Sequence, residues 1–208
     1  MGGSAIPGPT TIENRRAVDA PGPGAGFQQN GPTGAQPQAP APRLVGWPRA
    51  IQWREFRNIT ARPSGVNEDA QISSEGVPDT NIRPQLENGR FRIPAITIRL
   101  TIVQNDTWVV ADKKSDDLLV HEQGHYDITG LLGRELGDAL LAIRAADMAE
   151  LQREVARILE HYRDQSEKLT KQYDETDTDN GRNADEQQRW NKKLEDCIKN
   201  GARLAPAP

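Results

Sequence analysis

Residues 118–128 read LLVHEQGHYDI, and this short stretch decides how the chain is interpreted. At about 100° per residue, the apolar positions from Leu118 to Ile143 fall on one stripe of a helix, and His121 and His125 lie on the same stripe. Side chains four residues apart sit one above the other, about 6 Å apart. The stretch therefore predicts a long amphipathic helix that turns two imidazoles toward the core.

The two histidines have the spacing of zinc ligands. A catalytic zinc site needs one further protein ligand and an open position for water. Glu122 follows His121 directly, so it lies about 100° around the helix, beside the metal, where it can move a proton from the water to the leaving amine. The motif predicts a Zn²⁺-dependent peptidase acting on peptide or protein substrates, with Glu122 as general base. The other interpretation is a chance match in which His121 and His125 are satisfied core residues.

Periodicity elsewhere predicts an α+β fold. Residues 96–103 alternate apolar and polar, as a half-buried strand does, and residues 104–106 supply a turn before 107–111, so a hairpin is expected. Capping patterns at Asp147 and Asn183 predict two further helices. We expect a small antiparallel sheet beside the active-site helix, a helical C-terminal part, and a first strand that holds extended substrate by edge pairing.

The composition divides the chain into three parts. Residues 1–44 are rich in Gly, Pro, Ala and Gln and have too few large apolar side chains to offset the entropy of ordering, which predicts a disordered arm. Residues 45–202 are expected to form one metallopeptidase domain, and residues 203–208 a flexible Pro-rich tail.

Charge and hydropathy exclude several classes of protein. The net charge of −4, from 26 basic and 30 acidic residues, provides no basic field for nucleic acid. No apolar run approaches the roughly 20 residues of a membrane span, and the N-terminus shows no secretory signal. The single cysteine, Cys197, cannot form an internal disulfide. Neither the compartment nor the oligomeric state is indicated by these features.

The motif also carries a resemblance to a known family. Together with Trp-Val at 108–109, residues 118–128 resemble a bacterial family of predicted secreted zinc-dependent proteases. The family's opening Trp-x-x-Phe element is matched by residues 53–56, and the start of its Tyr-Asp-x-x-Thr-x-His-Gly segment by residues 173–174. The resemblance spans about residues 47–195. It implies a zincin-like fold, a zinc cofactor and secretion.

The family's second motif contains a histidine that would be a natural third ligand, and this chain departs from it. Aligned from Tyr173, Asp179 takes the place of that histidine; aligned on residues 178–181 with one residue inserted, Asn180 does. Aspartate is a competent zinc ligand and asparagine a poor one, so Asp179 is the expected third ligand. Asp174 is the other acidic candidate, provided that the preceding helix ends near Tyr173. On this basis Asp179→Ala should weaken zinc binding more than Asp174→Ala, and Tyr173 is expected to donate a hydrogen bond to the developing oxyanion.

A second function class is compatible with the same sequence. In that interpretation two long helices and the arm present an interaction surface, the zinc site is degenerate or structural, and no peptide is hydrolysed. Replacing Glu122 separates the two classes, because only the enzyme depends on it.

Overall fold

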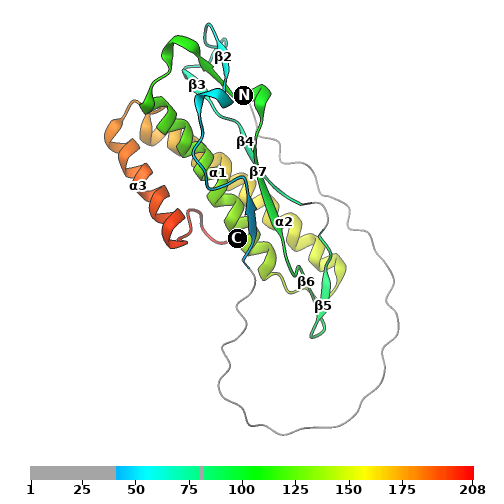
Figure 1. Cartoon of the computed structure of the whole chain (residues 1–208). Coiled ribbons are helices and arrows are strands. Elements are labelled where there is room, and N and C mark those ends of the chain that lie inside the picture. The colour runs from blue at the N-terminus through cyan, green and yellow to red at the C-terminus, as the bar shows by residue number, and fades with distance from the viewer. Residues whose placement is uncertain (1–40, 80–81) are drawn as a thin grey trace, which may run out of the picture.

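The computed structural model describes residues 41–79 and 82–208, so residues 1–40 of the predicted arm lie outside the described part of the chain. In the described part, short strands come first and long helices follow (Figure 1). The predicted α+β class is confirmed. Within these residues no helix is both long and apolar enough to cross a membrane.

The described residues form eight strands and seven helical segments, named here in sequence order. The strands are β1 (Arg43–Val45), β2 (Arg57–Ile59), β3 (Ala70–Gln71), β4 (Ser74–Pro78), β5 (Gln85–Glu87), β6 (Arg90–Arg92), β7 (Thr97–Ile102) and β8 (Trp108–Val110). The 3₁₀ helices are η1 (Trp53–Glu55), η2 (Gln104–Asp106) and η3 (Ala111–Lys113). The helical part comprises α1 (Asp116–Ala142), α2 (Met148–Lys171), the π-helix η4 (Gln172–Thr178) and α3 (Ala184–Asn200).

Strand β7 is the centre of a three-stranded sheet, with β1 parallel on one side and β4 antiparallel on the other. Ile98 and Leu100 are buried while Arg99 and Thr101 are exposed, as the predicted alternation requires. Because both edges of β7 are already paired, the strand cannot add an extended substrate. The expectation of edge pairing at this strand is wrong.

The predicted hairpin after β7 is also wrong. Strand β8 pairs with β2 in parallel and with β3 antiparallel, in a second sheet. The turn residues form η2, and the buried Thr107 hydroxyl then donates to Val103 O (3.0 Å) and accepts from Ser73 N (3.1 Å). These bonds direct the chain away from β7. Because β1–β7 and β2–β8 are parallel pairs, the two three-stranded sheets are mixed and not simply antiparallel.

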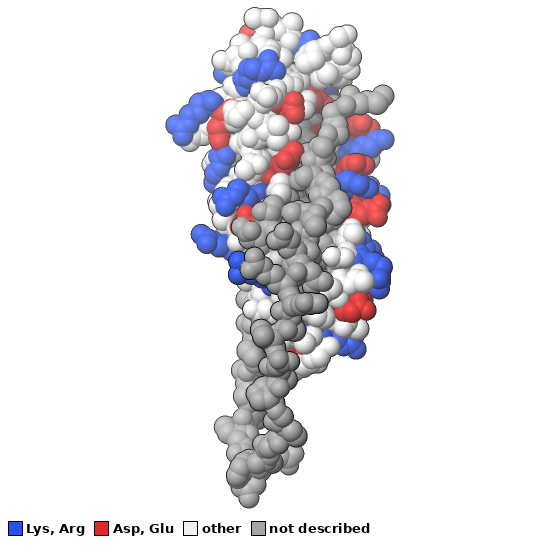
Figure 2. Space-filling model, turned by 90° about the vertical axis from the view of Figure 1, so that its right-hand side faces the viewer, with Lys and Arg blue, Asp and Glu red and all other residues white. Residues whose placement is uncertain are grey.

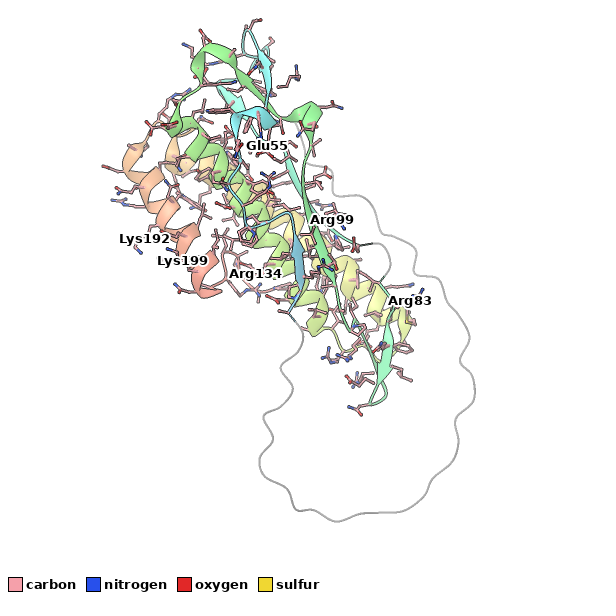
Figure 3. The ribbon with its side chains drawn as sticks, in the orientation of Figure 1. Glu55, Arg83, Arg99, Arg134, Lys192 and Lys199 are labelled. Carbon is pink, nitrogen blue, oxygen red and sulfur yellow. The ribbon has the colours of Figure 1, made fainter. Side chains whose placement is uncertain are left out.

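Helix α1 lies at the centre of the fold, between the strands on one side and α2 and α3 on the other (Figure 1). Ser115 caps its N-terminus, and its predicted apolar stripe, including Ile128 and Leu136, is buried. On the other side Arg134 donates to Cys197 O (3.0 Å) at the end of α3 (Figure 3). The helix that carries the motif is therefore packed between the strands and the other two helices.

The remaining helices begin where their caps predict. Asp147 accepts a hydrogen bond from Glu150 N (2.7 Å) at the start of α2, and Asn183 caps α3. The segment between them differs from expectation, because the first part of the predicted loop 174–181 is the π-helix η4. A π-helix has i→i+5 hydrogen bonds and is therefore wider than an α-helix, so it changes the direction in which the following side chains point.

The predicted tail is packed against the domain at its start. Leu204 and Ala205 are buried, and their N–H groups both donate to the carboxylate of Glu135, which is 1% exposed. Arg203 adds an ion pair to the same carboxylate at 3.6 Å. A buried carboxylate without partners would be costly, so these bonds fix residues 203–205 to α1.

Charges on the surface are mixed. On the face shown in Figure 2, basic and acidic side chains lie side by side. The helices carry ion pairs at the spacing of one turn, such as Arg157–Glu154 (2.9 Å) and Lys192–Asp196 (2.8 Å). Such exposed pairs contribute little to stability, so the fold depends on its core and not on its surface charge.

At Gly130 of α1 a side chain from the sheet side packs directly on the helix. A Cβ built there would lie 2.4 Å from ring atoms of the buried Trp47, whose indole N–H also donates to Asp127 of α1 (2.9 Å). Only glycine leaves room for the indole.

We predict that Gly130→Ala destabilises the protein although alanine is the better helix former. The helix propensity gained is worth about 1 kcal/mol, whereas overpacking a core costs about 1–3 kcal/mol. Chemical denaturation of the wild type, Gly130→Ala, Trp47→Phe and the double variant measures both terms. The smaller Phe ring should relieve part of the cost; an equal cost in both backgrounds would contradict the assigned contact.

Candidate metal centre

His121 and His125 lie on successive turns of α1 with their rings 4.9 Å apart and nearly perpendicular. His121 is almost fully buried, at 3% exposure, and His125 is half-buried. Helix α1 contacts the strands on one side and α2 and α3 on the other. The helix is therefore held in place, and the two imidazoles that it carries have a fixed position. This agrees with the inward direction predicted from the helical stripe.

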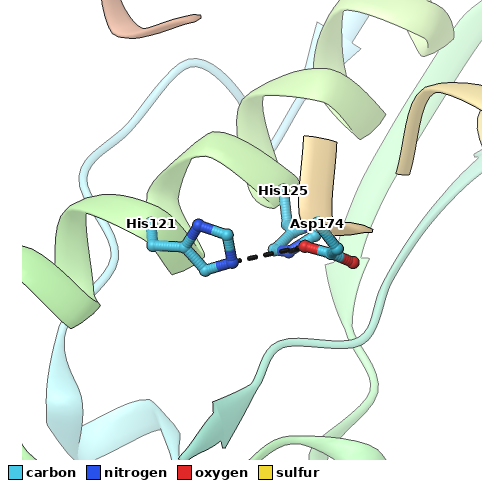
Figure 4. A group of neighbouring side chains, drawn as sticks. All are labelled: His121, His125 and Asp174. Atoms are coloured by element: carbon cyan, nitrogen blue, oxygen red, sulfur yellow. Dashed lines mark ion pairs between the residues drawn. The ribbon is translucent and has the colours of Figure 1, made fainter. Parts of the chain in front are cut away.

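Asp174 of η4 completes a group of three possible ligands (Figure 4). Its Oδ1 atom lies 2.7 Å from Nε2 of His125 and 3.3 Å from Nε2 of His121. Burial alone would raise the pKa of this carboxyl, but the contacts with His121 and His125 outweigh it and lower the pKa to about 2. Asp174 is therefore an anion at neutral pH.

The protonation of His121 follows from the hydrogen bonds behind it. The Tyr173 hydroxyl must donate to the backbone carbonyl of His121 (3.0 Å), so it accepts from Gln187 Nε2 (2.7 Å), which also donates to Asn191 (2.8 Å). The other amide atom of Gln187, Oε1, then accepts from Nδ1 of His121 (3.0 Å). A neutral His121 therefore carries its proton on Nδ1 and its lone pair on Nε2.

This assignment makes the centre fit a metal ion. The Nε2 lone pair of His121 faces a carboxylate oxygen of Asp174 that is buried and receives no hydrogen bond of good geometry. Two electron-rich atoms in contact repel each other unless a proton or a metal ion lies between them. The protonated imidazoles account for the lowered pKa of Asp174, and a bound metal ion would take the place of those protons. Two imidazole nitrogens and one carboxylate oxygen are ligands that zinc and other divalent transition metals accept.

Glu122 lies beside this group and is only 2% exposed. Its Oε2 atom accepts a hydrogen bond from Ile72 N (2.7 Å), next to β3, and no described residue donates to Oε1. Burial raises the pKa of this carboxyl to about 7. The side chain thus has one oxygen held by the backbone and the other free to exchange a proton.

Tyr173 has a different position from the one expected. It is fully buried, its ring stacks on His121 (centroids 4.7 Å apart, 7° between planes), and its hydroxyl is occupied on both sides. Burial also raises the pKa of this hydroxyl well above its usual value. The structure therefore makes Tyr173 a support for His121 and not a donor to an oxyanion. A Cβ at Gly124 would lie 2.1 Å from the Tyr173 hydroxyl, which explains the glycine inside the motif.

Asp179, the expected third ligand, is not brought to the centre. It adopts a left-handed conformation (φ 47°) just after η4, and its side chain is 69% exposed and pairs with Arg182 (3.5 Å). The expectation is corrected in favour of Asp174, because η4 ends the α-helical geometry at Lys171 and turns residue 174 inward. Asn180 is left-handed too (φ 53°), and Gly181 follows it, packed against the His121 ring.

Gln187 is a part of the site that sequence reasoning missed. It comes from α3, 66 residues after the histidine that it orients, and no local pattern connects the two. Its signal in the sequence is weak: a polar residue on the inward face of a helix, one turn before Trp190.

Comparison with known proteins places the chain in a family. Residues 74–181, just over half of the chain, match the family of bacterial proteins of unknown function called DUF922, and the chain belongs to this family. No curated protein and no solved structure matches the chain. The matched segment runs from β4 into the turn after η4 and contains both histidines, Glu122 and Asp174.

We predict an order of metal affinities from this geometry, with zinc as the probe. Asp174→Ala should weaken binding by more than about 100-fold, because even residues that only orient a ligand are typically worth about 10–100-fold. Gln187→Ala should fall within that smaller range, and Asp179→Ala should change little. Competition with a chromogenic chelator measures all three. A greater loss in Asp179→Ala than in Asp174→Ala would restore the expectation from sequence.

A second prediction concerns Glu122 in the metal-free protein. Its folded-state pKa of about 7 exceeds the ordinary 4.5, so the folded state prefers the protonated carboxyl, and stability is lost as pH rises from about 4.5 to 7. Glu122→Gln cannot ionise and should therefore be the more stable protein at pH 8, by roughly 1–3 kcal/mol, with no such advantage at pH 4. Urea denaturation in the presence of a chelator tests this. Identical pH dependence in both proteins would show that Glu122 is not desolvated.

Proposed function

We propose that this protein is a zinc-dependent peptidase, with His121, His125 and Asp174 as the zinc ligands and Glu122 as the general base. The observation that supports it most directly is the convergence of two imidazole Nε2 atoms and one unpaired carboxylate oxygen beside a buried glutamate. Structural zinc sites are usually closed by four protein ligands, whereas catalytic sites use three and leave one position open. Three ligands among the described residues fit the catalytic kind.

Zinc bound there would supply Lewis-acid chemistry, lowering the pKa of a coordinated water and polarising the carbonyl of the substrate. The protein's own part falls to Glu122. Ile72 N holds its Oε2, which orients Oε1 for proton transfer, and a pKa near neutrality suits a group that must both accept and release a proton. The carboxylate takes a proton from the attacking water and delivers it to the nitrogen of the leaving amine.

The residues behind the ligands have positioning roles in this proposal. Gln187 fixes the His121 tautomer that presents a lone pair on Nε2, and Tyr173 holds the ring by stacking. The resemblance of residues 118–128 to predicted secreted zinc-dependent proteases supports the same reaction. On the same resemblance we propose that the protein is secreted.

The test combines metal analysis with an assay on casein, an unstructured substrate. We expect about one zinc per chain and hydrolysis that falls about 10²–10⁴-fold in Glu122→Gln while zinc content and folding persist. Glu167→Gln, which removes an exposed carboxylate of α2, is the matched control and should keep full activity. Absence of zinc uptake would refute the site, and undiminished activity in Glu122→Gln would refute the assigned base. Bound zinc without hydrolysis in any form would favour an interaction module with a structural metal.

A further inference from the structure

A groove of about 270 Å³ lies between α1 and α3. The apolar side chains of Val120, Leu194 and Ile198 line it, together with Gly124. Its volume is smaller than the roughly 300–1,000 Å³ of pockets that enclose a whole small-molecule ligand. The groove is therefore suited to one large side chain of a peptide that lies across the two helices.

The surface of the groove calls for an uncharged, apolar occupant. Val120 is 41% exposed, one of two large apolar side chains that are exposed in the described part of the chain. Each charged residue that lines the groove already has a partner. Lys199 pairs with Glu195, and Asp127 accepts a hydrogen bond from the indole of Trp47 (2.9 Å). What the groove still offers is apolar surface, whose complement is an apolar side chain on a neutral segment.

The described part of the chain begins close to this groove. Pro42 packs on Gly137 of α1, where a Cβ would lie 2.4 Å from Cβ of the proline. Gly137 lies two heptads after Gln123, which lines the groove, so the two positions differ by only about 40° around the helix. At 1.5 Å per residue, the groove extends from about 15 Å to about 26 Å from Gly137, between Asp127 and Val120.

Phe27 is the first large apolar residue that precedes the described part of the chain. Residues 28–42 contain none, and residues 20–42 carry no charged side chain. The chain from Phe27 to Pro42 can span up to about 50 Å when extended, which is about twice the distance to the far end of the groove. The segment around Phe27 thus has the reach, the neutral charge and the apolar side chain that the groove requires.

We propose that the groove between α1 and α3 is a docking site for the chain's own N-terminal segment, with the ring of Phe27 bound against Val120 and Ile198. The composition that predicts a disordered arm agrees with this, because one anchored aromatic side chain needs no core of its own. The groove adjoins the supports of the metal centre, since Asn191, which also lines it, accepts a hydrogen bond from Gln187 (2.8 Å). The inference does not depend on the proposed peptidase function.

Fluorine NMR of the full chain tests the docking, with 4-fluorophenylalanine in place of its three phenylalanines. Phe56 and Phe91 report the folded domain, and the signal that is lost in Phe27→Leu is that of Phe27. We expect this signal to differ from its position in a labelled peptide of residues 20–34, and Val120→Arg to return it to that position. Leu86→Arg makes the same change at the other exposed large apolar residue and, as the matched control, should leave the signal where it was.

Chymotrypsin measures how much of the segment is undocked, because only an undocked chain can be cleaved after Phe27. We expect cleavage there to be about tenfold faster in Val120→Arg than in the wild type or in Leu86→Arg. Equal rates in all three proteins would overturn the proposal.

Two NMR results would also contradict it: a wild-type Phe27 signal at the peptide position, or a shift that persists in Val120→Arg. A shift that disappears on dilution would assign the groove to a second copy of the chain instead. If Val120→Arg disturbs the signals of Phe56 and Phe91, Ile198→Ala decides in its place, and an unchanged Phe27 signal in that variant would exclude the groove.

Discussion

The hydrogen bond from the Tyr173 hydroxyl to the backbone carbonyl of His121 is the contact on which the metal centre depends. A carbonyl can only accept, so this one bond sets the direction of those that follow, through the Gln187 amide to Nδ1 of His121. Because Asp174 directly follows Tyr173 in the chain, the same contact holds Asp174 close to α1. One tyrosine thus fixes both the orientation of a ligand and the place from which the carboxylate arrives.

The centre concentrates groups that an ordinary core would exclude. His121, Glu122 and Tyr173 are nearly inaccessible to water, and Asp174 Oδ1 has no good donor. Such an arrangement opposes folding, because desolvated charges and mismatched lone pairs raise the energy of the native state. Proteins retain this conflict mainly where a site requires it, which distinguishes the group from a chance pair of core histidines.

What the sequence could predict here is what depends on near neighbours. The α1 stripe, the alternation of β7 and the caps at Asp147 and Asn183 each follow from a period or a spacing within a few residues, and each was found. The partners of β8, the inward turn of Asp174 and the role of Gln187 depend on segments far apart in the chain, for which a single sequence has no local signal. Asp179 and Asp174 show the limit of a single sequence. An alignment without insertions favours Asp179 as the third candidate ligand, whereas the wider turn of η4 brings Asp174 to the two histidines and leaves Asp179 exposed.

The bonds from residues 204 and 205 to Glu135 have a consequence for how the protein matures. Glu135 belongs to the same helix as His121 and His125, and its buried carboxylate is bonded to a segment about 70 residues later in the chain. During synthesis, α1 can form early but its middle cannot be sealed from water until residue 205 has emerged. The helix that carries His121 and His125 therefore reaches its final packing only late in synthesis.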